Sequence, residues 1–477
     1  MKFGLLLALI FSYSAVAAAP KTLSQKLEDK KYYYSALNEF FRESYTREIF
    51  TKDVTRLENL LFYTGIELLE DYEPSLLERY PSSSTRFILG RQAMQAKDTT
   101  RAIDLFSKVH PSHRFYPEAK LLESQIQSQQ GDQKRQDKAI GQCLRSALSH
   151  EKSSKGEKIQ RYYRMVYEVC LVNKARQLFK SGEFQKSIEA YNRIPKKSYK
   201  WPYILLEKAW VYYQMGDFNR TLGILITYKS PLMDTYFFPE AEYLTALAYF
   251  RLCLYQDSLV VINQYYQAYR PRFLALENVL RKNKNSQTYF YNLMFRPGED
   301  LKKHEDFVRH IITRLKKQTR FSLDFNSIYK IKREVKRIKT NEKKEIQQKL
   351  LGHLAEVQSN MVSKINYNAK SDVFQFLQTV PFFSSELFKM NLEIISRKKD
   401  LVYKNRKLVT DRNRGDYSNV KQSRFEHFWK FQGEFWADEL GDYSLGLQSN
   451  CQTTKKASLT DPNDATPAQA ESSEEKK

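Results

Sequence analysis

The side chains that could do chemistry are scattered along this sequence. Glu434 and Asp438 stand one helical turn apart, where two carboxylates could serve as general acid and base, but acidic neighbours of this kind usually lie on a surface. The seven His are dispersed without an H-E-x-x-H pair, and neither a G-x-S-x-G segment nor a P-loop occurs. We therefore predict that the protein is not an enzyme and has no cofactor and no metal site.

Four cysteines could bind zinc, form disulfides or remain thiols. They form no C-x-x-C pair and have no His at metal-ligand spacing, which argues against zinc. Cys143 and Cys170 are the one pair close in the sequence, and export would permit a disulfide between them. Because Cys143, Cys170 and Cys253 each fall in an apolar helical pattern, the sequence favours buried free thiols; the fourth cysteine is Cys451.

The first residues indicate a secretory signal peptide over residues 1–18. A positive start, Met1-Lys2, precedes an apolar stretch, and Ala15-Val16-Ala17 supplies the small residues that a signal peptidase recognises. The apolar stretch is too short to span a membrane, and no Cys stands at the cleavage point, so we expect neither an anchor nor a lipoprotein. We predict an exported protein, periplasmic if the host has two membranes.

Composition favours a helical protein with an acidic partner. Fifteen Gly and fourteen Pro are few for 477 residues, which is typical of helices joined by short loops. The net charge of +23 implies an acidic molecule or surface as a partner, without naming it. We expect an all-α fold.

A pattern that recurs at 34 residues divides the middle of the chain. Ala209, Gly216 and Leu222 have counterparts 34 residues earlier, at Ala175, Gly182 and Ile188. This spacing predicts a helix, a tight turn and a second helix, with small residues where the two helices cross. Further copies follow the same plan, one around Gly90 and Ala102, one around Gly131 and Ala139, and one around Ala246 and Leu259, in which Cys253 takes the place of the turn glycine.

These five copies resemble tetratricopeptide repeats, which span residues 87–270 here. The resemblance implies an α-solenoid, a right-handed stack of helix pairs whose first helices line a concave face. An insertion separates Gly131 from Gly182 by 51 residues and puts continuous stacking in doubt at that point. Residues 30–86 read as amphipathic helices that form a cap or a degenerate sixth repeat.

The resemblance also implies a protein-binding groove. In such repeats one stripe of the first helix faces the concave side, beginning one residue after the small position. The groove would be aromatic with a basic edge, suited to an extended or helical peptide with apolar and acidic side chains. The predicted groove residues are Arg176, Phe179, Lys180, Tyr203, Leu206, Trp210, Tyr213, Gln214, Tyr243, Leu247, Phe250 and Arg251.

After the repeats, residues 271–445 keep a helical pattern but lose the 34-residue phase and become strongly basic. The basic run "IYKIKREVKRIKTNEKKEIQQKL" could be a solvated helix face, or it could contact anionic lipid or an acidic cell-wall polymer. Nucleic acid is not expected as a partner of an exported protein. Residues 446–477 are polar and rich in small residues, which predicts a disordered tail. The candidates for anionic contact are Lys332, Arg333, Lys336, Arg337 and Lys339.

Residues 424–443, which precede the tail, are rich in aromatic and acidic side chains. This segment could pack back onto the protein, either in the groove or on the basic helices, or it could bind a partner. The sequence does not decide between these possibilities. The segment from 424 to 443 also resembles the ending of periplasmic tetratricopeptide-repeat proteins of the adventurous gliding-motility machinery, which implies a scaffold subunit of an envelope-spanning complex. The candidate docking residues are Phe428, Trp429, Phe431, Phe435 and Trp436.

The sequence therefore predicts an exported scaffold or adaptor that binds a protein partner in the cell envelope. Two alternatives are a basic module for anionic envelope polymers or lipid, and a protein of the lytic transglycosylase type, which also has an α-superhelix. That family would require a Glu-Ser motif and a Gly-Leu-Met-Gln-like stretch. "DYSLGLQSN" is superficially similar to the second, but it lacks the Met and has no suitably spaced Glu-Ser before it.

Overall fold

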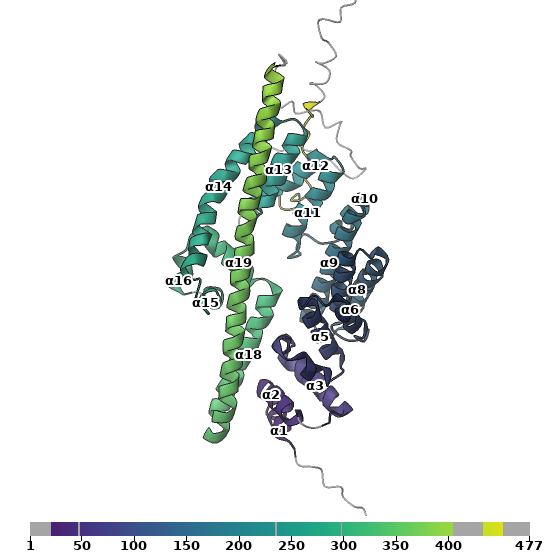
Figure 1. The fold of residues 1–477 in the computed structure, drawn as a ribbon, viewed down its shortest axis with the longest axis vertical. Coiled ribbons are helices and arrows are strands. Elements are labelled where there is room, and N and C mark those ends of the chain that lie inside the picture. Colours follow the sequence, from purple (N-terminus) through teal and green to yellow (C-terminus); the bar gives the residue numbers. More distant parts are fainter. Residues whose placement is uncertain (1–20, 46–47, 234–235, 297, 404–432, 452–477) are drawn as a thin grey trace, which may run out of the picture.

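The protein is built from helices packed as sequential hairpins (Figure 1), as the sequence predicts. The computed structural model describes residues 21–45, 48–233, 236–296, 298–403 and 433–451. The predicted signal peptide lies outside this range. The N-terminal elements are α1 (Leu23–Asp29), α2 (Tyr33–Ser44), α3 (Thr51–Thr64), the 3-10 helix η1 (Glu67–Asp71) and α4 (Pro74–Glu78).

Five hairpins follow at the predicted positions. The residue at each hairpin turn has a left-handed backbone: φ is 63° at Lys97, 78° at Gly131 and Gly182, 77° at Gly216 and 57° at Cys253. Cys253 thus takes the conformation of the glycine that it replaces. The hairpins are α5 (Ser83–Gln95) with α6 (Thr99–Ser107), α7 (Tyr116–Gln130) with α8 (Gln133–Ser153), α9 (Glu157–Lys180) with α10 (Phe184–Asn192), α11 (Trp201–Gln214) with α12 (Phe218–Ile226), and α13 (Pro239–Arg251) with α14 (Tyr255–Lys282); the 3-10 helices η2 (Thr227–Lys229) and η3 (Pro231–Met233) precede α13.

The same local interactions recur in these hairpins. In three of them an aspartate after the turn caps the second helix, as when Asp217 accepts from the Arg220 N–H at 2.9 Å. In the last three hairpins the small residue at the helix crossing is fully buried, and a hydroxyl of the second helix donates to its carbonyl. Ser187 donates to Ala175 at 2.8 Å and Ser258 donates to Ala246 at 2.9 Å. These bonds explain why the sequence pattern specifies the crossings.

The insertion after Gly131 lengthens one hairpin and the helix that follows it. It extends α8 to 21 residues and α9 to 24 residues, and these two helices pack on each other. Packing between consecutive helices therefore continues through the insertion. A disulfide joins Cys143 of α8 to Cys170 of α9 inside this contact.

Beyond the hairpins the chain turns back along them. Helix α14 runs unbroken through Pro271, so the predicted change of region at 270/271 falls inside a helix. The 60-residue helix α19 then runs the length of the molecule, beside α18 at one end and beside α13 and α14 at the other (Figure 1). The elements after α14 are α15 (Tyr289–Phe295), α16 (Glu299–Lys302), α17 (Asp306–Lys316), α18 (Thr319–Asn341) and α19 (Lys344–Tyr403).

Helix α19 packs against both ends of the hairpin stack. Near its C-terminal end, Leu387 and Ile394 are fully buried in a cluster that includes Tyr265 of α14. The Tyr265 hydroxyl also donates to the Val380 carbonyl of α19 at 2.9 Å. Near its N-terminal end, α19 contacts α2 and shares one apolar core with α1 to α3.

A buried carboxylate fastens α18 to the N-terminal helices. Glu334 is 5% exposed and accepts hydrogen bonds from the Tyr34 N–H at 3.1 Å and the Ser35 N–H at 2.9 Å. These N–H groups belong to the first turn of α2 and have no partner within their own helix. The negative charge therefore caps α2 from a helix about 300 residues away in the sequence.

Glu58 of α3 caps α5 in a similar way. It accepts from the Ser84 N–H at 2.8 Å and the Ser84 hydroxyl at 2.6 Å, and His113 lies 3.4 Å away. Burial alone would raise the pKa of Glu58, but the hydrogen bonds from His113 and Ser84 lower it to about 2. The ionised carboxylate is therefore the form that stabilises the first hairpin.

We predict that Glu58→Gln lowers the free energy of unfolding by about 1–3 kcal/mol at pH 7. Because the pKa is depressed from its ordinary 4.5, the contribution is present above that pH and is lost as the pH falls toward 2. Urea unfolding of both proteins at several pH values should show the difference shrinking in acid. Glu157→Gln is the control, because that side chain is 85% exposed and should contribute little. An equal loss at neutral and acid pH would contradict the prediction.

Candidate protein-binding surfaces

The centre of the predicted groove is an aromatic cluster on α11 and α12. The Trp210 and Tyr213 rings meet edge to face with centroids 5.6 Å apart, and Tyr213 meets Phe218 at 5.4 Å. The Trp210 indole N–H donates to Glu240 of α13 at 2.8 Å, which holds the ring across two hairpins. All three rings are half-buried, so they keep apolar surface for a ligand.

The residues predicted for the basic edge are Arg176, Lys180 and Arg251. Arg176 of α9 donates two hydrogen bonds of 2.7 Å to Glu207 of α11, and hydrogen bonding to Glu207 raises the pKa of Arg176. The Arg176 side chain remains 59% exposed. Lys180 donates to the Ser128 carbonyl at 3.1 Å, and the Arg251 guanidinium lies over the Phe218 ring. The edge therefore offers cations that are already oriented.

Part of the predicted groove is covered by the chain itself. Tyr243 packs against Phe383 of α19, with ring centroids 5.5 Å apart, and Arg397 of α19 lies over Phe250. Tyr203 packs against Tyr236 and Phe238 of the loop that leads into α13. The predicted stripe thus divides into a part that contacts other elements of the fold and a part that stays open. The open part comprises Arg176, Phe179, Lys180, Trp210, Tyr213, Gln214 and Arg251, whereas Leu206 is buried and Leu247 is partly buried in the core.

The described part of the C-terminal segment, residues 433–451, packs on α11 and α12 and reaches the turn after α13. Leu440 is 4% exposed and shares a core cluster with Trp201 and Leu205 of α11. The Gly441 N–H donates to the Thr227 hydroxyl at 2.9 Å. Further along, Leu445 and Leu447 pack in one apolar cluster with Phe218, and the Cys451 sulfur lies 3.4 Å from the Arg251 carbonyl oxygen, so the segment borders the predicted groove. Of the five docking candidates, Phe428, Trp429 and Phe431 lie outside the described residues, Phe435 is half-buried, and Trp436 is 59% exposed.

Hydrogen bonds with Asn219 of α12 fix the position of this segment. The Asn219 side chain of α12 donates to the Leu447 carbonyl at 3.0 Å and accepts from the Leu447 N–H at 2.9 Å. The Leu445 N–H donates to the Asn219 carbonyl at 3.1 Å. Next to it, a Cβ added at Gly223 would lie 2.0 Å from the Tyr443 carbonyl oxygen. The segment can approach α12 this closely because Gly223 has no side chain. Residues 446–451 of the predicted tail take part in this docking, and 452–477 lie outside the described residues.

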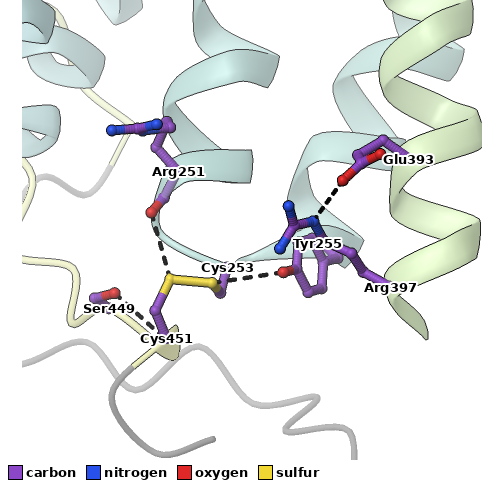
Figure 2. Close-up of a disulfide and its surroundings, with 7 residues drawn as sticks. All are labelled: Arg251, Cys253, Tyr255, Glu393, Arg397, Ser449 and Cys451. Carbon is purple, nitrogen blue, oxygen red and sulfur yellow. Dashed lines mark hydrogen bonds and ion pairs between the residues drawn. A yellow bond between two sulfur atoms is a disulfide. The ribbon is translucent and has the colours of Figure 1, made fainter. Parts of the chain in front are cut away.

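A disulfide between Cys253 and Cys451 secures the end of the segment (Figure 2). The Cα atoms are 5.2 Å apart, and the Asn450 N–H beside Cys451 donates to the Leu252 carbonyl. With the bond between Cys143 and Cys170, this leaves no free cysteine, so the prediction of buried free thiols is wrong. It failed because Cys451 is 198 residues from Cys253 and comes near it only when the C-terminal segment docks.

The five basic candidates lie on α18. Arg333, Lys336, Arg337 and Lys339 are exposed and Lys332 is half-buried. Arg337 donates to the Lys30 carbonyl at 2.6 Å and lies over the Tyr32 ring, and Arg333 lies over the Tyr329 ring. Arg337 therefore helps to join α18 to α1 and α2, while the other four leave charge at the surface.

Comparisons with protein-family models and with curated proteins found no match. In the part of the chain that the structure describes, no helix is both long and apolar enough to cross a membrane. Two disulfides are typical of an oxidising, extracytoplasmic compartment.

We predict that Gly223→Ala lowers the free energy of unfolding by about 1–3 kcal/mol, because the new methyl group would meet the backbone of the docked segment. The variant should also show more unpaired Cys253 and Cys451 in non-reducing peptide maps, with Cys143 still bonded to Cys170. Gly352→Ala on α19 is the matched control, since a Cβ there meets nothing within 4 Å. The control should gain about 0.5–1 kcal/mol from better helix propensity. Equal gains in both variants would show that the segment does not rest on Gly223.

Proposed function

We propose that the protein is an exported scaffold whose helical hairpins form a tetratricopeptide-type solenoid and whose open groove binds a protein partner. The observation that carries this proposal is the aromatic cluster of Trp210, Tyr213 and Phe218, bordered by Arg176 and Arg251. Aromatic and arginine side chains are the commonest anchors at protein interfaces. The two hairpin features that support the repeat class are the left-handed turns and the buried small residues at the crossings.

The chemistry of the groove suggests the kind of partner. Exposed guanidinium and ammonium groups favour carboxylates, and half-buried rings favour apolar side chains. The proposed ligand is a peptide segment, extended or helical, that carries both. Such a ligand would contact α9 and α11 and the end of α13, because α19 covers Tyr243 and Phe250.

The proposed place of action is the cell envelope. The signal-like start of the sequence and the two disulfides both support export, and in a host with two membranes the compartment would be the periplasm. The similarity of residues 424–443 to the ending of gliding-motility proteins suggests a subunit of an envelope-spanning complex. Oriented binding surfaces on a rigid frame suit such a subunit.

We predict that Trp210→Ala combined with Tyr213→Ala weakens binding of the partner by roughly thirtyfold or more, the loss of about 2 kcal/mol that is typical when an anchor is truncated. The partner would be isolated from envelope extract with the mature wild-type chain, and its dissociation constant would then be measured for each variant.

The matched control is Phe382→Ala with Phe388→Ala, which removes two rings that are 59% and 55% exposed on α19, outside the groove. The control should bind like the wild type. Thermal melting and non-reducing peptide maps would show that both variants fold. Equal affinity of the groove variant and the wild type would rule out the groove as the binding surface.

A further inference from the structure

A separate cavity lies where α18 and α19 meet the N-terminal helices. Its volume is about 340 Å³, and α2, η1, α18 and α19 all contribute to its wall. This volume is within the usual size range of small-molecule sites, and it equals the volume that about ten water molecules occupy in liquid water. The cavity is remote from the groove, which α9, α11 and α13 line.

The wall is apolar over part of its area and acidic elsewhere. Leu37, Leu68 and Met361 contribute apolar surface. Four carboxylic acids reach the cavity from three elements, Glu67 and Asp71 from η1, Asp324 from α18 and Glu356 from α19. The protein as a whole is strongly basic, so this concentration of acids is local.

The cations at the cavity do not balance these acids. The Lys364 ammonium lies 3.1 Å from Glu70 and 3.2 Å from Asp71, so it is already held by two carboxylates. Burial lowers the pKa of His353, which keeps that imidazole neutral near pH 7. Arg320, which is near Asp324, forms an ion pair with Asp372. Glu67, Asp324 and Glu356 therefore remain without a cation in direct contact among the described residues.

Among these acids, Asp324 gives the strongest evidence for a ligand in the cavity. It is 7% exposed, no hydrogen bond to its carboxylate is found among the described residues, and its oxygens open onto the cavity that it lines. Burial raises the pKa of Asp324 to about 6, and burial likewise raises the pKa of Glu67. A buried acid without a donor is costly to keep, and a ligand that supplies donors and positive charge would remove that cost.

We propose that this cavity binds a short aliphatic polyamine, whose ammonium groups would meet the carboxylates of Glu67, Asp324 and Glu356. The methylene groups between them would lie against Leu37, Leu68 and Met361. The amides of Asn38 and Asn360 also line the cavity and can accept further N–H groups. A metal ion is a poorer fit, because no group of three His, Cys, Asp or Glu among the described residues is spaced to hold one.

Such a ligand would act on the frame of the protein. It would join η1 and α2 to α18 and α19, the elements at which the chain closes on itself. A ligand that binds only the folded state raises the free energy of unfolding by RT ln(1 + [L]/Kd), so stability rises with the concentration of free ligand. The site would thus couple the rigidity of the scaffold to the polyamine content of its compartment.

Spermidine is the probe for this site, titrated into the mature protein by calorimetry, with thermal melting as a second readout. We expect a saturable 1:1 interaction that raises the melting temperature. Asp324→Asn should weaken it about tenfold or more, because it removes a charged partner inside a cavity. Asp324→Asn without spermidine should be at least as stable as the wild type, because an unpaired buried charge is gone.

Asp400→Asn is the matched control, because it removes the same charge from an exposed position near the far end of α19. It should bind spermidine like the wild type. 1,8-Octanediol, an uncharged chain of similar length, should not bind.

The pH dependence gives an independent check. Asp324 faces Glu67, Glu70, Lys364 and Arg320, and its raised pKa means that it takes up a proton as the pH falls through about 6. Spermidine should therefore bind more tightly at pH 7 than at pH 5, and this difference should shrink in Asp324→Asn. The absence of spermidine binding, or equal binding by wild type and Asp324→Asn, would overturn the proposal.

Discussion

The packing of α19 against both ends of the hairpin stack is the contact on which the rest of the structure depends. A stack of helical hairpins buries its apolar faces only between neighbours, so each open end exposes apolar surface. Here one helix covers both ends, through Leu387 and Ile394 at α14 and through the core that it shares with α1 to α3. The ends are therefore fixed relative to each other, and the stack of hairpins becomes a closed frame.

Sequence patterns predicted the parts of this fold that local interactions determine. The left-handed turn at Gly216, its aspartate cap and the buried Ala209 all lie within about a dozen residues, so their spacing is visible in the chain. The docking of α19 could not be predicted in this way. Its partners in α2 and α14 are separated from it by long stretches of sequence, and an amphipathic pattern shows that a face is buried without showing against what.

The predicted binding surfaces show the same difference between local contacts, which the sequence indicates, and contacts with distant helices, which it does not. Helical geometry placed Trp210 and Tyr213 on one stripe with Arg176 and Arg251 nearby, because these positions follow from the repeat. The cover over Tyr243 and Phe250 was not visible, since it comes from α19. The acidic cavity was missed altogether, because Glu67, Asp324 and Glu356 meet only after the frame closes. A single Asp within the apolar pattern of α18 was the one sign in the sequence.

The docked C-terminal segment covers one side of helix α11. One stripe of this helix, Trp201 and Leu205, packs against Leu440 of the docked segment, and the buried Lys208 lies near Asp442. The opposite stripe carries Trp210 and Tyr213. Because the bond between Cys253 and Cys451 fastens the segment in an oxidising compartment, the first stripe is already occupied there. Under the proposed function, a partner that approaches α11 would then be limited to the side on which the aromatic rings and the cations lie together.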